Sequence, residues 1–238
     1  MLASLLAGLS TPLGAWLILS RRQVSPAMLA FTLALASGVM ATVVATELVP
    51  TGLRLAGWPL FVSAAAAGAV MLSLLRGAAA EWQGAHDAGP SRLRLVGWFI
   101  ATAIALHDIP EGMAIGAGDA VGQRLGVVIA LAIALHNIPE GMSIAAPLAM
   151  ARESRRRILA ATIAIGLVTP LGTLVSLAIG RLGAEWSAMV LALASGAMVY
   201  VVGRDTLPES LKTGRAAALL GLLAGALLML LLAALHGP

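Results

Sequence analysis

The sequence has no cysteine and few charged or aromatic residues, and each shortage excludes a class of protein. Without cysteine among its 238 residues, the chain has no disulfide and no thiolate metal ligand, so any metal site must use nitrogen and oxygen. Charged residues make up 11% and aromatic residues 4%, whereas a soluble domain has about 25% charged residues. Apolar residues reach 60%, with a mean hydropathy of +0.96. This composition indicates an integral membrane protein.

Apolar stretches long enough to cross a bilayer recur along the whole chain. We expect eight of them, at residues 2–20, 27–49, 58–75, 95–117, 123–149, 158–180, 186–208 and 216–235. The runs lack the two-residue alternation of membrane strands, so an all-α fold is predicted. The connections are short, which predicts a single transmembrane domain over residues 1–238. No basic residues precede the first span and no cleavage pattern follows it, so we expect a retained helix.

The fifteen Lys and Arg residues are unevenly divided between the two ends of these spans. Twelve fall on one side: Arg21, Arg22, Arg76, Arg92, Arg94, Arg152, Arg155, Arg156, Arg157, Arg204, Lys212 and Arg215. Only Arg54, Arg124 and Arg181 fall on the other, so both termini are predicted outside the cytoplasm. A pI near 11 is also typical of nucleic-acid-binding proteins. The sequence has no aromatic or Gly-Arg pattern beside its basic residues, so no nucleic-acid partner is expected. Arg155 to Arg157 are expected to meet anionic lipid headgroups.

A repeat with an offset of 158 residues links the two ends of the chain. Residues 11–14 and 169–172 both read TPLG, and SGVM at 37–40 matches SGAM at 195–198. The alternative is coincidence, because sequences rich in alanine and leucine produce chance matches. Five spans separate the copies, so they cross the membrane in opposite directions, as in the inverted repeats of transporters. The predicted arrangement is 3+2+3, with helices 1–3 and 6–8 around a central helix 4/5 pair.

A second motif occurs twice near the middle of the chain. AIALHDIPEGM at 103–113 returns twenty-nine residues later as AIALHNIPEGM at 132–142. On a helix, positions three and four apart share a face, so the three polar side chains of each copy project together. Ionised groups cost roughly 2.5–3.5 kcal/mol each at the centre of a membrane helix. We therefore predict an intramembrane metal site. Its six candidate ligands are His107, Asp108, Glu111, His136, Asn137 and Glu140.

The ligand types restrict the metal but do not select one. Imidazole and carboxylate without thiolate suit Zn(II), Fe(II), Mn(II), Co(II) or Cd(II). Three acids can offset most of the charge of two divalent ions, so one-ion and two-ion sites are both open. Each histidine and glutamate could instead be a structural partner between helices, but duplication at mid-depth favours function. The predicted sixth span contains no acid, and its polar residues are Thr162, Thr169, Thr173 and Ser176.

HDIPEG and HNIPEG in the fourth and fifth spans resemble the signature of the ZIP family of metal-ion transporters. SGVMATVVATELVP and SGAMVYVVGRDTLPES are similar to its bacterial GufA-like branch. The resemblance implies an eight-helix protein of the inner membrane, usually a homodimer, that moves divalent metal, chiefly zinc, toward the cytoplasm. It implies neither a prosthetic group nor an enzymatic activity. It also implies that the histidines and glutamates at 107, 111, 136 and 140 hold one metal position, with Asp108 and Asn137 joining the glutamates at a second.

Other functions remain open from the residues alone. An intramembrane metal-dependent hydrolase would use metal-bound water, although no H-E-x-x-H motif is present. A proton-linked solute carrier would use the same acids and histidines without metal. Glu47, Asp205 and Glu209 lie near the ends of the second and seventh spans. They form either a relay at the mouth of the ion path or interfacial pairs, for instance Asp205 with Arg204.

Overall fold

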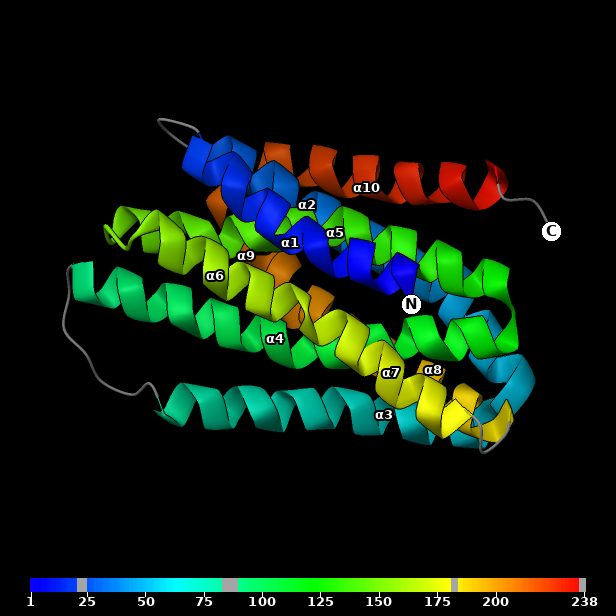
Figure 1. Ribbon diagram of the computed structural model, residues 1–238. Helices are drawn as coiled ribbons and strands as arrows, with labels where there is room; N and C mark the ends of the chain where they lie inside the picture. Colours follow the sequence, from blue (N-terminus) through cyan, green and yellow to red (C-terminus); the bar gives the residue numbers. More distant parts are fainter. Residues whose placement is uncertain (21–24, 83–89, 181–183, 236–238) are drawn as a thin grey trace.

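The computed structural model describes the chain except residues 21–24, 83–89, 181–183 and 236–238. Every regular element in the described part is a helix (Figure 1). The order is α1 (Leu2–Ser20), α2 (Pro26–Val43), the π-helix η1 (Val44–Leu48), α3 (Val49–Trp82), α4 (Pro90–Val121), α5 (Gln123–Met150), α6 (Arg155–Gly166), α7 (Val168–Gly180), α8 (Ala184–Val201), the π-helix η2 (Val202–Thr206), α9 (Leu207–Thr213) and α10 (Arg215–Leu235).

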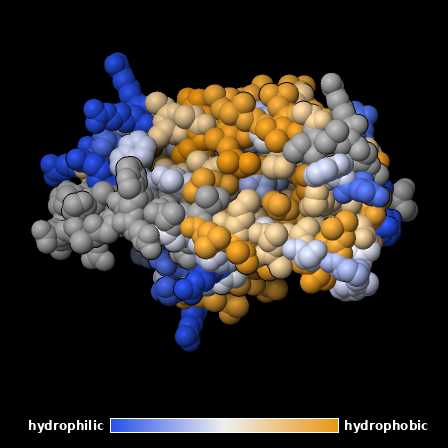
Figure 2. Space-filling model, turned by 90° about the horizontal axis from the view of Figure 1, so that it is seen from below, coloured by the Kyte–Doolittle hydropathy of each residue, from blue (hydrophilic) through white to orange (hydrophobic). Residues whose placement is uncertain are grey.

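The surface of the bundle matches a lipid environment. Apolar residues cover the middle of the face seen in Figure 2, and hydrophilic residues gather at its two ends. On α10, beyond Arg215 at its start, the large exposed side chains are all leucines: Leu219, Leu220, Leu223, Leu227, Leu230 and Leu231. In water such a face would be unfavourable, whereas lipid tails solvate it. The protein is therefore an integral membrane protein of the all-helical class.

Six stretches of the described residues are long and apolar enough to cross a membrane. They are Leu2–Ser20, Pro26–Leu74, Gln123–Met150, Arg155–Ala178, Glu185–Thr213 and Arg215–Leu232. The predicted span 27–49 and all but the last residue of the predicted span 58–75 fall within one of these stretches. The predicted span 95–117 lies in α4, which is not one of the six. The long second stretch is broken at Gly57, whose φ of 70° and ψ of 168° are not helical. Glycine permits this left-handed conformation, so the chain turns sharply there.

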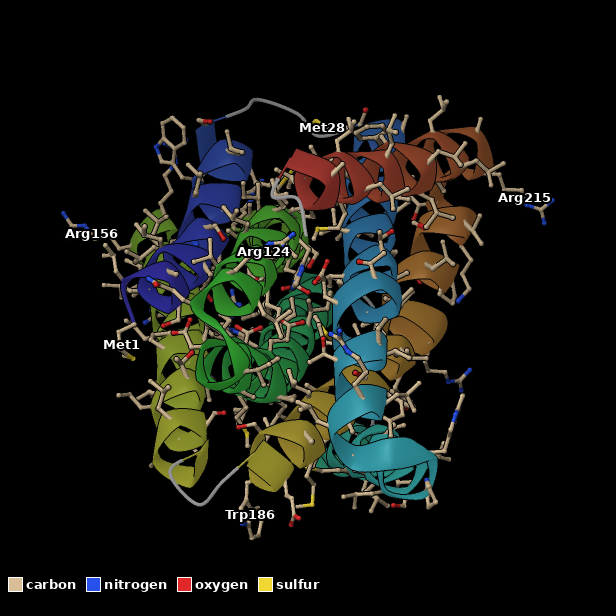
Figure 3. All side chains as sticks on the ribbon, turned by 90° about the vertical axis from the view of Figure 1, so that its right-hand side faces the viewer. Met1, Met28, Arg124, Arg156, Trp186 and Arg215 are labelled. Atoms are coloured by element: carbon tan, nitrogen blue, oxygen red, sulfur yellow. The ribbon has the colours of Figure 1, made fainter. Side chains whose placement is uncertain are left out.

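Helices α4 and α5 occupy the middle of the bundle. Seen along the bundle in Figure 3, they are surrounded by the other helices. Helix α1 packs along α5, and α7 packs along α4. The pairs α2 with α10 and α3 with α8 lie farther out, and α2 and α8 also contact α5 and α4, respectively. The doubled polar motif thus lies on two central helices that several other helices pack against.

Close glycine contacts bring α1 onto α5 and α7 onto α4 in matching positions. A Cβ at Gly14 would meet the carbonyl oxygen of Ile138, and a Cβ at Gly172 would meet that of Ile109. Gly141 lies in the same way against the carbonyl oxygen of Thr11, and Gly112 against that of Thr169. The partners on the outer helices are 158 residues apart and those on the central helices are 29 apart. The two sequence repeats therefore describe one packing arrangement that occurs twice.

The π-helical segments follow the same offset. Residues 44–48 and 202–206 are the two π-helices of the described chain, and they are 158 residues apart. A π-turn widens a helix by one residue and often marks a functional site. One contact occurs in only one of the two arrangements. The Ser37 Oγ lies 2.7 Å from the Thr206 Oγ1. The residues at the corresponding positions are Ser195 and Leu48, and a leucine has no hydroxyl to form the same contact.

Ion pairs fasten the ends of α4, α5 and α6 to one another beyond the apolar region. The Glu153 carboxylate lies 3.3 Å from the Arg94 Nε and 3.2 Å from the Arg157 Nη1. It also accepts a hydrogen bond from the backbone N–H of Ser154. That backbone N–H, followed by the charges of Arg157 and Arg94, holds the pKa of Glu153 below its ordinary value against an opposing effect of desolvation.

Replacing Gly196 by alanine is expected to lower the Tm, because the new Cβ would overlap the Ala65 carbonyl oxygen and push α8 away from α3. Gly77→Ala is the matched control, since no heavy atom of the described residues lies within 4 Å of a Cβ there. It should leave the Tm unchanged or raise it, because alanine is favoured over glycine by about 1 kcal/mol inside a helix. Thermal unfolding in detergent measures both. A wild-type Tm for Gly196→Ala would contradict this close approach.

Glu153→Gln is expected to lower the Tm at neutral pH by removing the charge that the two arginines face. Because the folded-state pKa is depressed, the stabilisation is fully present above the ordinary glutamate pKa and is lost as the pH falls through the folded value. The Tm gap between wild type and variant should therefore narrow as the pH falls below 4.5, the ordinary value for glutamate. A gap that stays constant over that range would show that the charge is not the stabilising feature.

Candidate metal site

The central pair brings the polar side chains of the doubled motif into the interior. Asp108, His136 and Asn137 have 0% of their surface exposed, and Glu111 and Glu140 have 1%. Position 107 lies in α4, one helical turn before Glu111. The side chain of His107 is outside the described residues, so its place in the site stays a prediction.

Three of the predicted ligands lie together. Glu111, His136 and Glu140 each offer a ligand atom, and these atoms all lie within 4.8 Å of one another. The His136 Nε2 is 3.0 Å from the Glu111 Oε2, so this pair bridges α5 and α4 directly. Donors that converge at this separation from two facing helices form the kind of oxygen and nitrogen pocket that holds a divalent cation.

Asp108 and Asn137 lie close to this group along their helices but have different surroundings. Asp108 is fully buried and is not a member of the cluster of three. The Asn137 Nδ2 donates a hydrogen bond of 3.0 Å to the backbone oxygen of Ala7, which ties α5 to α1. A carboxylate cannot donate such a bond, so the two copies of the motif are not chemically equivalent at this position.

Two oxygen atoms of the predicted ligands have no hydrogen-bond partner among the described residues. They are the Glu111 Oε1 and the Asn137 Oδ1, both buried. Buried polar atoms are nearly always paired in folded proteins, and each exception requires an explanation. Oxygens that coordinate a cation are one such exception, because the cation supplies the interaction that a donor otherwise would.

Two threonines on the helices that pack against the central pair have the same feature, and no motif marks them as functional residues. Thr11 and Thr169 are fully buried, and in the described structure neither hydroxyl has a hydrogen-bond partner. Their neighbour Thr173 is satisfied, donating 2.8 Å to the backbone oxygen of Gly112. The repeated TPLG contained the signal, but hydroxyls in apolar helices usually bond to their own backbone, so the pattern alone does not indicate a ligand.

The acids near the span ends lie in different settings. Glu209 is paired with Lys212 at 3.7 Å on the surface, where both are well exposed. This matches the interfacial pairing that we considered for it. Glu47 lies partly buried in η1, near the charges of Arg124 and Arg54. The side chain of Asp205 is outside the described residues, so its pairing with Arg204 stays a prediction.

Comparison with known proteins connects this chain to a family. The family model for the ZIP Zinc transporter matches residues 75–233. A Zinc transporter ZupT of Chlorobium luteolum is 36% identical over 254 residues, covering 97% of this chain and 95% of the relative. A ZupT of Corynebacterium aurimucosum is 32% identical, covering 94% and 92%. The Zinc transporter ZIPB of Bordetella bronchiseptica is 37% identical over a shorter segment, covering 57% of this chain and 44% of the relative.

Zn²⁺ is expected to raise the Tm of the wild-type protein. At a zinc concentration of 100 times the Kd, binding adds about 2.7 kcal/mol to the free energy of unfolding. Glu140→Gln should abolish that shift, because an amide is a much weaker ligand than a carboxylate. Without metal the variant should be at least as stable as wild type, since it removes one of the charges crowded into the interior. Thermal unfolding with Zn²⁺ or a chelator measures both effects. An undiminished zinc shift in Glu140→Gln would exclude this carboxylate as a ligand.

Proposed function

Since this chain belongs to the ZIP zinc transporter family, we propose that it carries zinc ions across the membrane through the site between α4 and α5. The buried cluster of Glu111, His136 and Glu140 carries the proposal. Two carboxylates and an imidazole in a membrane interior are costly, and a divalent cation is the partner that offsets this cost. The relatives named above are zinc transporters, which favours zinc as the ion. Cd²⁺, Fe²⁺, Mn²⁺ and Co²⁺ remain candidate further substrates on ligand chemistry alone.

The full ligand set extends the cluster. His107, one turn before Glu111, completes a first metal position with Glu111, His136 and Glu140. Asp108 and Asn137 supply oxygens for a second position beside it, supported by their complete burial and by the unpaired Asn137 Oδ1. The carboxylates shared between the two positions would let an ion move from one to the next without losing all its ligands.

The architecture proposed for transport is eight membrane crossings in a 3+2+3 inverted repeat, forming one domain over residues 1–238. The break at Gly57 supports counting α2 with η1 and α3 as separate crossings, and the paired glycine contacts support the repeat. Inverted repeats allow alternating access, because either half can adopt the conformation of the other around a fixed site. The alternation then consists of rocking the outer helices against α4 and α5.

The orientation that we propose places both termini outside the cytoplasm of a bacterial cell. The start of α1 and the end of α10 lie toward the end of the bundle opposite the α5–α6 turn (Figure 1). That turn carries the exposed Arg152, and the first turn of α6 carries the exposed Arg155, Arg156 and Arg157. Basic residues are retained on the cytoplasmic side of the inner membrane. Net movement is toward the cytoplasm. A homodimer is the expected assembly on family resemblance.

Uptake of radioactive zinc into proteoliposomes tests the proposal. Wild type is expected to accumulate Zn²⁺, and Glu111→Ala and Glu140→Ala should each reduce the initial rate by at least about tenfold, because each removes a buried ligand. Glu209→Ala is the matched control, since this acid forms an exposed ion pair at the surface. It should transport at the wild-type rate.

Each variant must first be shown to insert and to remain monodisperse in detergent. Wild-type uptake by a well-folded Glu111→Ala or Glu140→Ala protein would contradict the proposal. If no divalent metal enters but a proton gradient drives uptake of an organic solute, the protein is the metal-independent carrier instead.

A further inference from the structure

Exposed arginines gather where α5 passes into α6. They are Arg152, Arg155, Arg156 and Arg157. The acid among them, Glu153, lies 3.2 Å from the Arg157 Nη1 and 3.3 Å from the Arg94 Nε, so its charge is already matched. In the part of the chain that the structure describes, no ion pair reaches the other three arginines of the group. The structure thus separates Arg157, which is tied to Glu153, from neighbours whose charge the protein leaves uncompensated.

One face of α6 and α7 continues from this patch as an exposed apolar surface. Exposed positions recur along the two helices every three or four residues, which places them on one side. They are Arg156, Ala160, Ile163, Leu167, Leu171 and Leu174. The other side of these helices is covered, because α6 packs against α1 and α7 packs against α4. A row of apolar side chains that ends in a guanidinium group matches a phospholipid, in which acyl chains are joined to a charged headgroup.

The position of Arg156 at the edge of the bundle favours lipid over the aqueous phase as its partner. Viewed along the bundle, its side chain lies at the outer margin and points away from the other helices (Figure 3). The hydrophilic ends of the molecule border directly on its apolar middle (Figure 2). At such a border an arginine keeps its aliphatic stem against acyl chains while its guanidinium group reaches the headgroups.

We propose that Arg152, Arg155 and Arg156 bind the phosphate group of an anionic phospholipid, whose acyl chains lie along the exposed face of α6 and α7. A guanidinium group donates two parallel N–H bonds to a phosphate, a geometry that lysine does not offer. A zwitterionic phospholipid carries its own cation beside the phosphate, so uncompensated arginines select the anionic kind. Free phosphate would meet the same arginines but would leave the apolar face unused. This binding is independent of which ion the protein transports.

Lipid titration of the delipidated full-length protein in detergent tests the assignment. Native mass spectrometry measures the affinities for phosphatidylglycerol and phosphatidylcholine with the same acyl chains, in wild type and in the double variant Arg155→Gln with Arg156→Gln. The matched control is Arg204→Gln with Lys212→Gln, which removes the same charge from two other exposed positions. Two further titrations of wild type with phosphatidylglycerol contain either inorganic phosphate or about 1 M salt.

Wild type should prefer phosphatidylglycerol, and the arginine double variant should bind it roughly twenty-fivefold more weakly, about fivefold for each basic residue lost near a headgroup. The control variant should bind like wild type. Inorganic phosphate should not displace the lipid. High salt should reduce the preference, because it screens exposed charges within about 3 Å.

Equal affinity of wild type for the two lipids would overturn the proposal, whether or not the variants fold. An unchanged affinity in the arginine variant, or an equal loss in the control, would overturn it as well, since the attraction would then come from total charge. Displacement of the lipid by inorganic phosphate would make the patch a site for a soluble anion instead.

Discussion

The structure depends on keeping two carboxylates and an imidazole together in the interior of a membrane protein. Glu111, His136 and Glu140 are within reach of one ion and have almost no exposed surface. Each ionised group costs roughly 2.5–3.5 kcal/mol at mid-membrane, so the arrangement is stable only if other groups compensate. Part of the compensation is internal, through the contact between His136 and Glu111. We assign the remaining compensation to the bound cation. The free-energy cost of burying these groups without an ion thereby favours binding of the ion.

The helices around the site follow from the same requirement. To exclude lipid from these groups, α1 and α7 must lie directly against α5 and α4, and only glycine at the contacts permits that approach. The contacts occur twice, through partners 158 residues apart on the outer helices and 29 apart on the central ones. A site enclosed by matching glycine contacts from two related halves is suited to exposure from either side. The Asn137 hydrogen bond to Ala7 and the Ser37 contact with Thr206 make the halves unequal, which lets one conformation be preferred.

Much of this could be predicted from the sequence because its strongest signals are chemical and duplicated. The repeat of HxIPEG gave Glu111, His136 and Glu140, which the structure places together, and the TPLG repeat led to the matched contacts of α1 and α7. Other features have no local signature. The break at Gly57 is one glycine among 26. The π-helices depend on how a whole helix packs. The unpaired state of the Thr11 and Thr169 hydroxyls depends on which carbonyls the neighbouring helices already use, and the sequence does not contain that information.

The most direct test of the account is the location of zinc in crystals of the protein, from anomalous scattering at the zinc absorption edge. The account predicts a peak between α4 and α5, bonded to Glu111, His136 and Glu140. The distances from zinc to these nitrogen and oxygen atoms should be about 2.0–2.2 Å, the usual range for such bonds. A fully occupied zinc position elsewhere, with Glu111 and His136 still hydrogen-bonded to each other, would contradict it and reduce the buried cluster to a structural contact between two helices.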